Sequence, residues 1–275
     1  MTTAAHVEGQ GKQFAREHAG VVRAAAKIGF LARGVTWITI GILAFRLASG
    51  VSKKSADRSG ALQEIGSKPF GKFMLVVIAI AFAAYALYNL AAGAFDFDGK
   101  GAGDRVLRFV RTVLYGTGAW TAYHFATGSK VKADKKQSVD FTAKMMDRSM
   151  GPLLVGLIGV VLIAAGIYNA SKAFGKKYEE GLQTFELSPA NEKIIGLLAR
   201  VGYISRGAVF AVVGLLFIQA ARTHNAGEAT GLDGALRRLL KLSYGRPLVA
   251  VLGIGLVAFG LFSLVEARYR KIETS

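Results

Sequence analysis

Long apolar stretches alternate with short charged segments along almost the whole chain. Three of these stretches, at 73–95, 149–171 and 247–265, run for 23, 23 and 19 residues without a charged side chain. About 20 apolar residues in a helix are enough to cross the hydrocarbon core of a bilayer. An amphipathic helix of a soluble protein would carry a polar stripe at every turn, and residues 74–84 carry none. The pattern therefore predicts three transmembrane helices.

A shorter apolar stretch precedes each of these helices, at 35–45, 112–129 and 207–221. An arginine near the end of a helix can place its guanidinium among the lipid headgroups while its aliphatic stem stays in hydrocarbon. With Arg33 and Arg46 at opposite interfaces, the first of these stretches extends to a spanning length. The chain is thus expected to cross the membrane six times.

The apolar stretches form three copies of one two-helix unit. The segment IGFLARGV at 28–35 returns as VGYISRGA at 201–208, and a weaker copy, RTVLY, occupies 111–115. Internal repeats of this kind set the architecture of a whole fold. We therefore predict an all-α polytopic membrane protein with six transmembrane helices, built as three tandem two-helix repeats in a pseudo-threefold arrangement. The expected segments are a polar or amphipathic N-terminal segment at 1–23 and repeats at 24–98, 99–178 and 179–275.

Small residues recur at equivalent positions of the repeats. Membrane helices associate through close packing of their backbones, which small side chains permit. These positions are therefore expected to mark helix contacts rather than a ligand site. They are Gly34 and Gly41 on the first helix, and on the second helices the series Ala84, Ala164 and Ala258 and the series Ala86, Gly166 and Gly260.

An arginine stands near the start of the first helix of every repeat, and an amide or hydroxyl stands near the end of every second helix. Because the two helices of a repeat run antiparallel, both groups fall within about two turns of the same membrane surface. We predict three equivalent polar clamps in one layer, which act as structural contacts or as a seat for a phosphate headgroup. The clamp residues are Arg33, Arg111 and Arg206 with Asn89, Asn169 and Ser263 or their tyrosine neighbours.

The connectors between paired helices carry amphipathic segments. In 232–244, leucines alternate with Arg237, Arg238 and Lys241. Such a segment is typical of a helix that lies in the membrane interface. Residues 61–65 and 141–146 are expected to be shorter equivalents, although a solvated basic loop is an equally good interpretation of the middle one.

Charge and composition define the expected partners. The formal net charge is +17, and basic residues occur in every connector, where they would meet anionic headgroups. No basic recognition helix or aromatic-basic module for nucleic acid is present in the sequence. We expect anionic membrane lipids as partners, consider a second membrane protein, and expect no nucleic acid.

Candidate chemistry is sparse. The absence of cysteine excludes disulfides and thiolate metal sites. The sequence contains no nucleophile elbow, no zinc-protease motif and no phosphate-binding loop. His124 and His224 could in principle ligate haem from neighbouring helices, but an interfacial role for both is the simpler interpretation. No catalytic residue, cofactor or metal is predicted.

These observations favour a non-catalytic protein that acts as a scaffold, an accessory subunit or a lipid-interacting element of a membrane. A transporter or channel for small solutes, with a pathway between the three repeats, is the alternative. Ion-driven transporters usually keep a charged or unwound site at mid-membrane, which the sequence does not show. Lys and Arg residues number 18 on the side of the termini and 17 on the other, so the charge bias does not set the orientation. Because the first 27 residues are charged and lack a signal peptide, we expect a multi-pass membrane protein with both termini in the cytoplasm.

Two motifs resemble those of one bacterial membrane family, catalogued as domain of unknown function number twelve hundred and six. They are the G-[FY]-x-[AS]-R-G opening at 29–34 and 202–207 and the glycine-proline entry to the second helix at 69–71 and 244–247. The resemblance covers about residues 24–270 and implies an integral inner-membrane protein without bringing an activity. The second repeat departs from the pattern, since Arg111-Thr112 replaces Arg-Gly and the leading glycine is missing. The helix packing of that repeat is the least defined by the sequence.

Overall fold

The computed structural model describes residues 19–51, 54–95, 102–129, 134–174 and 189–269. Regular secondary structure in these ranges is entirely helical, which confirms the predicted all-α class. The predicted N-terminal segment lies outside the described residues up to residue 18, and 19–23 already belong to the first helix. The elements are α2 (Ala19–Ala48), α3 (Arg58–Gly66), α4 (Gly71–Phe95), α5 (Ala102–Ala126), α6 (Asp134–Met146), α7 (Gly151–Ser171), α8 (Pro189–Thr223), the 3₁₀ helix η2 (Ala226–Glu228), α9 (Leu232–Leu239) and α10 (Gly245–Tyr269).

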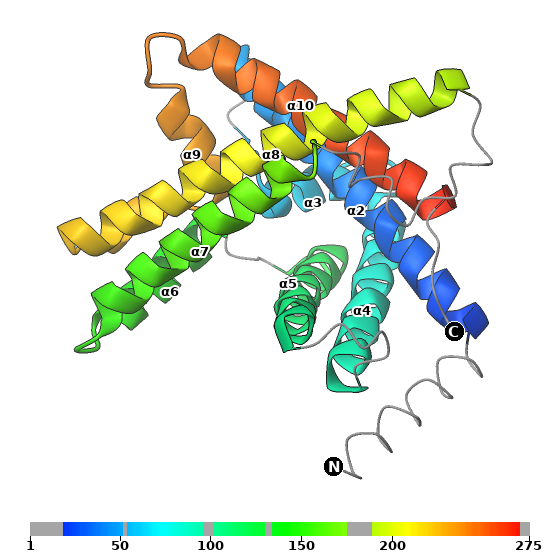
Figure 1. Cartoon of the computed structure of the whole chain (residues 1–275), viewed down its shortest axis with the longest axis horizontal. Coiled ribbons are helices and arrows are strands. Elements are labelled where there is room, and N and C mark those ends of the chain that lie inside the picture. Colours follow the sequence, from blue (N-terminus) through cyan, green and yellow to red (C-terminus); the bar gives the residue numbers. More distant parts are fainter. Residues whose placement is uncertain (1–18, 52–53, 96–101, 130–133, 175–188, 270–275) are drawn as a thin grey trace.

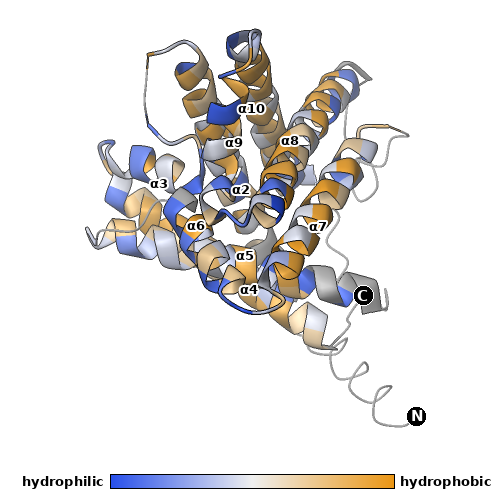
Figure 2. Ribbon diagram, turned by 90° about the vertical axis from the view of Figure 1, so that its left-hand side faces the viewer, coloured by the Kyte–Doolittle hydropathy of each residue, from blue (hydrophilic) through white to orange (hydrophobic). Residues whose placement is uncertain are grey.

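Five of the described helices, α2, α4, α7, α8 and α10, are long and apolar enough to cross a membrane. In Figure 2 the ribbons of α7, α8 and α10 are coloured mostly as hydrophobic residues. Helix α5 is 25 residues long, but Asp104, Arg105, Arg108 and Arg111 all fall in its first ten residues. Its remaining residues, 112–126, include several Gly, Thr and Tyr residues, a Trp and a His, so α5 is less hydrophobic than the five helices and is not among them. The apolar helices indicate a membrane protein.

Helices pair most extensively between repeats rather than within them. Helix α4 packs along α5, α7 along α8, and α10 along α2, and Figure 1 shows α7 beside α8 and α4 beside α5. Each pair joins the second helix of one repeat to the first helix of the next, and the pair of α10 and α2 returns from the last repeat to the first. Within repeats, α8 contacts α10 and α2 contacts α4 over smaller areas.

Glycines let the paired backbones touch. A Cβ atom added to Gly41 would lie 2.6 Å from the carbonyl oxygen of Gly253, and one added to Gly214 would lie 2.6 Å from that of Gly159. A second contact of each pair lies seven residues away along each helix, where Gly34 meets Gly260 and Gly207 meets Gly166. In the third pair, Thr112 Oγ1 donates to the carbonyl of Ala86 at 3.4 Å. The predicted helix contacts at Gly34, Gly41 and the series Ala86, Gly166 and Gly260 are thus confirmed.

The second repeat is packed differently, because α5 and α7 do not form an extensive contact like that of α2 with α4 or of α8 with α10. Ala258 is buried, whereas its equivalent Ala164 is exposed. The prediction of a helix contact is therefore wrong for Ala164. Repeat 2 has Leu107 where repeats 1 and 3 have Gly29 and Gly202. Gly29 lies against Tyr85 of α4 and Gly202 against Phe259 of α10, and an added Cβ would come within 3 Å of either neighbour. Repeat 2 therefore lacks the glycine that permits this close approach in the other two repeats.

The connector helices α3 and α9 are partly buried in the bundle. Ala61, Leu62, Ala235 and Leu236 are fully buried, so the first halves of both helices pack among the spans. The expectation of helices that lie flat in the interface is thus wrong for these halves, because a helix lying on a surface would keep one face exposed. The basic residues Arg237 and Arg238 at the end of α9 remain partly exposed.

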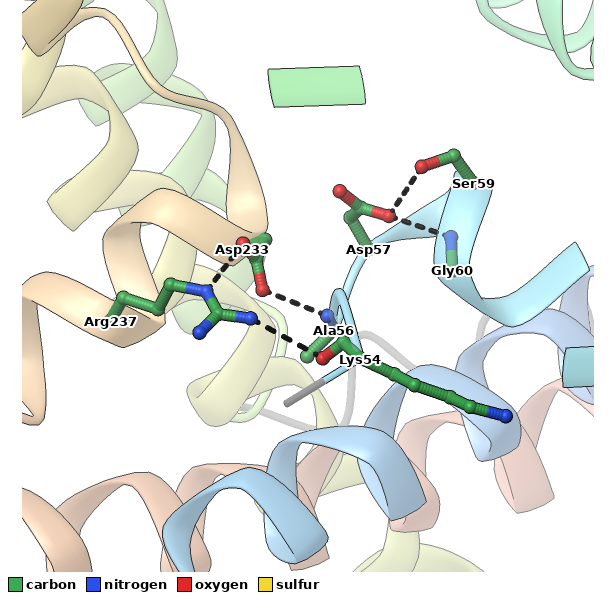
Figure 3. A network of polar contacts seen from close by, with 7 residues as sticks. All are labelled: Lys54, Ala56, Asp57, Ser59, Gly60, Asp233 and Arg237. Atoms are coloured by element: carbon green, nitrogen blue, oxygen red, sulfur yellow. Dashed lines mark hydrogen bonds and ion pairs between the residues drawn. The ribbon is translucent and has the colours of Figure 1, made fainter. Parts of the chain in front are cut away.

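Polar contacts join the connectors of repeats 1 and 3 (Figure 3). The carboxylate of Asp57 accepts hydrogen bonds from Ser59 Oγ and Gly60 N, both at 2.8 Å, and so caps α3. Asp233 on α9 accepts from the backbone N–H of Ala56 at 3.0 Å and from Arg237 Nε at 2.7 Å. The backbone that leads into α3 is thereby held by a carboxylate from the other end of the chain.

Glu64, on α3, gives the connector a pH dependence. Its carboxylate accepts a hydrogen bond from Lys54 Nζ at 2.6 Å, and Lys68 Nζ lies 3.2 Å away. The hydrogen bond from Lys54 lowers the pKa of Glu64 below its ordinary value, although burial opposes the shift. A depressed pKa in the folded state stabilises the fold above the unfolded pKa and loses that effect as pH falls through the folded value. We therefore expect the difference in melting temperature between the wild-type protein and Glu64→Gln to be present at pH 7 and to shrink below about pH 4. A difference that is constant from pH 7 to pH 3 would contradict this assignment.

Candidate functional site

Arg33 reaches across one of the two most extensive helix interfaces of the bundle, from α2 to α10. Its Nε donates to Ser263 Oγ at 3.1 Å, and its Nη2 forms an ion pair with Glu266. The Glu266 side chain is 1% exposed. The guanidinium also lies 4.7 Å from the ring centre of Phe30 and 5.5 Å from that of Phe259. Burying either charge without the other would be strongly unfavourable, so the two hold α2 against α10.

Glu266 is not among the predicted site residues, because in the sequence it directly follows the last apolar run, 247–265. A signal was available in the spacing. Glu266 follows Ser263 by three residues, and residues three apart share a helix face. The Glu266 carboxylate is therefore expected on the same side of α10 as Ser263, and so near the arginine that Ser263 contacts.

Arg206 occupies the equivalent position on α8 but has different neighbours. Its guanidinium lies 4.7 Å from the ring centre of Phe259, 5.0 Å from that of Phe210 and 5.2 Å from that of Trp37. Its Nε is buried and has no hydrogen-bond partner in the structure. Aromatic faces attract a cation, but they give the N–H group at Nε no acceptor.

The three predicted partners of the arginines each bond to their own helix. Asn89 Nδ2 donates to the carbonyl of Tyr85, Asn169 Nδ2 to that of Ala165, and Ser263 Oγ to that of Phe259, at 2.8, 2.7 and 2.9 Å. Ser263 additionally accepts from Arg33. The structure thus brings Arg33 and Ser263 together across repeats 3 and 1, because the first helix of a repeat packs on the preceding repeat. Equivalent clamps in all three repeats remain a prediction.

Arg111 lies half-buried on α5 and interacts electrostatically with Tyr85 of α4. Aromatic rings fill the space around this layer of arginines. Tyr85 and Tyr115 meet edge to face at 4.6 Å between ring centres, and Tyr203 meets Phe259 at 5.3 Å. All three repeats therefore contribute to one layer in which buried cations are surrounded by aromatic faces. Such a layer suits the recognition of an anion, since arginine forms paired hydrogen bonds with phosphate and carboxylate groups.

The two histidines considered as haem ligands have other surroundings. The ring of His124 packs against Trp120 at 4.3 Å and Tyr123 at 5.8 Å. His224 follows the last residue of α8 and adopts a positive φ of 52°. Within the part of the chain that the structure describes, no group of three or more His, Cys, Asp or Glu side chains could hold a metal ion.

Three segments of the chain, residues 28–96, 108–176 and 201–270, match the family described as Domain of Unknown Function (DUF1206). The chain belongs to this family. Each matched segment of DUF1206 falls within one of the expected repeats, and the tandem repeats are thereby established. A relative from Bacillus subtilis (strain 168), described as "Uncharacterized protein YxxB", is 27% identical over 252 residues, which cover 89% of this chain and 90% of that protein. No solved structure matches the chain.

Proposed function

We propose that this member of DUF1206 is a six-span, pseudo-threefold protein of the bacterial inner membrane that acts as a non-catalytic, lipid-interacting scaffold or accessory subunit. The observation that carries the proposal is the direct contact of helix backbones at Gly41 and Gly253 and at Gly214 and Gly159. These contacts leave no gap between the backbones of α2 and α10, or between those of α8 and α7, at these positions. A protein built to pass solutes between repeats would need space there.

The sixth span and the threefold plan are supported by the helix pairs. Helix α5 packs along the apolar helix α4, and 112–126 carry no Asp, Glu, Lys or Arg. Three pairs of the same kind, each between consecutive repeats, are what a threefold arrangement of repeats would produce. Six spans place both termini on one side of the membrane, which we propose is the cytoplasm.

The non-catalytic role is supported by the chemistry of the arginine layer. Glu266 is engaged by Arg33, and Arg206 lies among aromatic rings. This arrangement supplies neither an activated nucleophile nor a paired acid and base, the usual means of catalysis by side chains. It does supply cations near one membrane surface, where anionic lipids or an acidic segment of a partner would bind.

Reconstitution into liposomes tests the proposal. Purified protein in vesicles loaded with a pH-sensitive dye, or with radiolabelled small solutes, is expected to leave the flux within error of protein-free vesicles. Flux above that baseline that is abolished by Arg33→Gln would favour the transporter and overturn the scaffold.

A further inference from the structure

The second repeat leaves uncovered a helix face that the other repeats bury. On the first helices, Ser205 and Val209 of repeat 3 are 6% and 1% exposed, whereas their equivalents Val110 and Leu114 on α5 are each 48% exposed. A Cβ added to Gly255 of α10 would run into Ser205. The face at Ser205 is therefore covered by the second helix of its own repeat, and the face at Val110 is not.

The second helix of repeat 2 shows the complementary gap. Val161 and Tyr168 on α7 are 58% and 55% exposed, while the equivalent residues of α10, Gly255 and Phe262, are buried. We call the two uncovered faces the repeat 2 seam. It comprises Val110 and Leu114 of α5 with Val161, Ala164 and Tyr168 of α7.

Residue size keeps the seam open. In each repeat the first and second helices would cross at one pair of equivalent positions. The pair is Ser205 and Gly255 in repeat 3, Ala32 and Ala81 in repeat 1, and Val110 and Val161 in repeat 2. Two β-branched residues replace two small ones. Because close approach of membrane helices needs small residues at the crossing, the same contact cannot form between α5 and α7. An apolar occupant must cover these faces in the membrane.

A cationic side chain lies at the end of the seam nearest the arginine layer. Lys172 follows Tyr168 by one turn, and its Nζ lies 4.6 Å from the Tyr168 ring and 5.8 Å from the Tyr203 ring of α8. In repeat 3 the equivalent residue is Glu266, which forms the ion pair with Arg33. The pair of α7 and α8 thus has a lysine where the pair of α10 and α2 has a carboxylate. Arg206, the counterpart of Arg33, has a buried Nε without an acceptor.

We propose that the repeat 2 seam binds an anionic phospholipid from the side. Its phosphate lies between Lys172 and Arg206, with Arg111 on the α5 side, and accepts the hydrogen bond for which Arg206 Nε has no partner in the structure. One acyl chain runs along Val161 and Leu114 into the hydrocarbon. Because an acyl chain gains little by leaving its neighbours, the selectivity comes from the headgroup, which arginine and lysine recognise through charge and hydrogen bonds. This inference rests on the lipid-interacting role proposed above.

Native mass spectrometry of the full chain tests the headgroup. The protein is released from nanodiscs made of equal parts phosphatidylglycerol and phosphatidylcholine. The wild-type protein is expected to retain one phosphatidylglycerol, and Lys172→Gln and Arg206→Gln to lower that occupancy about tenfold relative to phosphatidylcholine. Arg200→Gln, which removes an exposed charge from the same helix, is the matched control and should retain the lipid. Equal retention of both lipids by the wild type, or full retention by Lys172→Gln, would overturn the proposal, as would displacement of the lipid by millimolar inorganic phosphate.

Cysteine cross-linking tests the seam. The chain has no native cysteine, so introduced pairs report without background. In lipid, Val110→Cys with Val161→Cys is expected to cross-link at least tenfold more slowly than Ala32→Cys with Ala81→Cys, the buried equivalent pair of repeat 1. Rapid cross-linking within one chain would show that the seam closes on itself, and cross-linking between chains would show that a second copy fills it. Either result rejects the lipid site, but neither bears on whether the protein conducts solutes in liposomes. Solute flux would instead reject the scaffold role and would leave the lipid retention unchanged.

Discussion

Replacing Glu266 by alanine is expected to destabilise the protein by about 3 to 5 kcal/mol, because the substitution leaves the Arg33 guanidinium buried without its carboxylate. Ser263 and two aromatic rings remain next to Arg33, but none of them carries a negative charge. The loss of stability can be measured as a shift in the unfolding midpoint when the protein in mild detergent is titrated with dodecyl sulfate. The interface between α2 and α10 is the part that the substitution weakens.

The design of the control follows from the same argument. A double variant, Arg33→Met with Glu266→Met, removes both charges and leaves side chains that pack well against aromatic rings. It is expected to recover most of the lost stability, since an apolar replacement of a whole buried ion pair is often neutral or stabilising. Glu228→Gln, in the more exposed pair with Arg238, should change stability by less than about 1 kcal/mol. A single Glu266→Ala variant as stable as the Glu228→Gln variant would contradict the role assigned to the buried pair.

A single methyl group at Gly214 is expected to weaken the pairing of α7 with α8. The added Cβ would lie 2.6 Å from a backbone carbonyl oxygen of the facing helix, and a backbone cannot move aside as a flexible side chain does. Overpacking of this kind costs about 1 to 3 kcal/mol. Gly41→Ala should have the same effect on α2 and α10, where the geometry is equivalent.

The matched control for both variants is Gly116→Ala on α5, because a Cβ at Gly116 meets nothing within 4 Å. Alanine has a higher helix propensity than glycine by about 1 kcal/mol, so this variant is expected to be neutral or slightly stabilised. The three variants are compared by their thermal stability in mild detergent. The quantity measured is the fraction of protein that stays monodisperse after heating. If Gly214→Ala and Gly116→Ala melt together, the glycine contacts do not hold the pair.

Several parts of this fold follow from local sequence. The uncharged run 149–171 had to become a helix such as α7, because lipid leaves no other way to satisfy a spanning backbone. The small residues Gly41 and Gly166 had to mark contacts, because in lipid they are the positions where backbones can approach. The missing leading glycine of repeat 2, replaced by Leu107, also indicated in advance that this repeat would pack differently.

The choice of neighbours required the folded chain. Glycines seven residues apart indicate that a helix has a face suited to close packing. The sequence around Gly34 does not indicate whether that face of α2 packs against α4 or against α10. The structure places Arg33 on Glu266 of the third repeat, while Arg206 lies among aromatic rings with no carboxylate from repeat 2. Repetition of the motif predicts three equivalent clamps, and this remains a prediction. The contact between Arg33 and Glu266, which are 233 residues apart, could not be inferred from either repeat alone. The position of Glu266 carries Lys172 in repeat 2, so the residue that faces an arginine depends on which repeat packs against it.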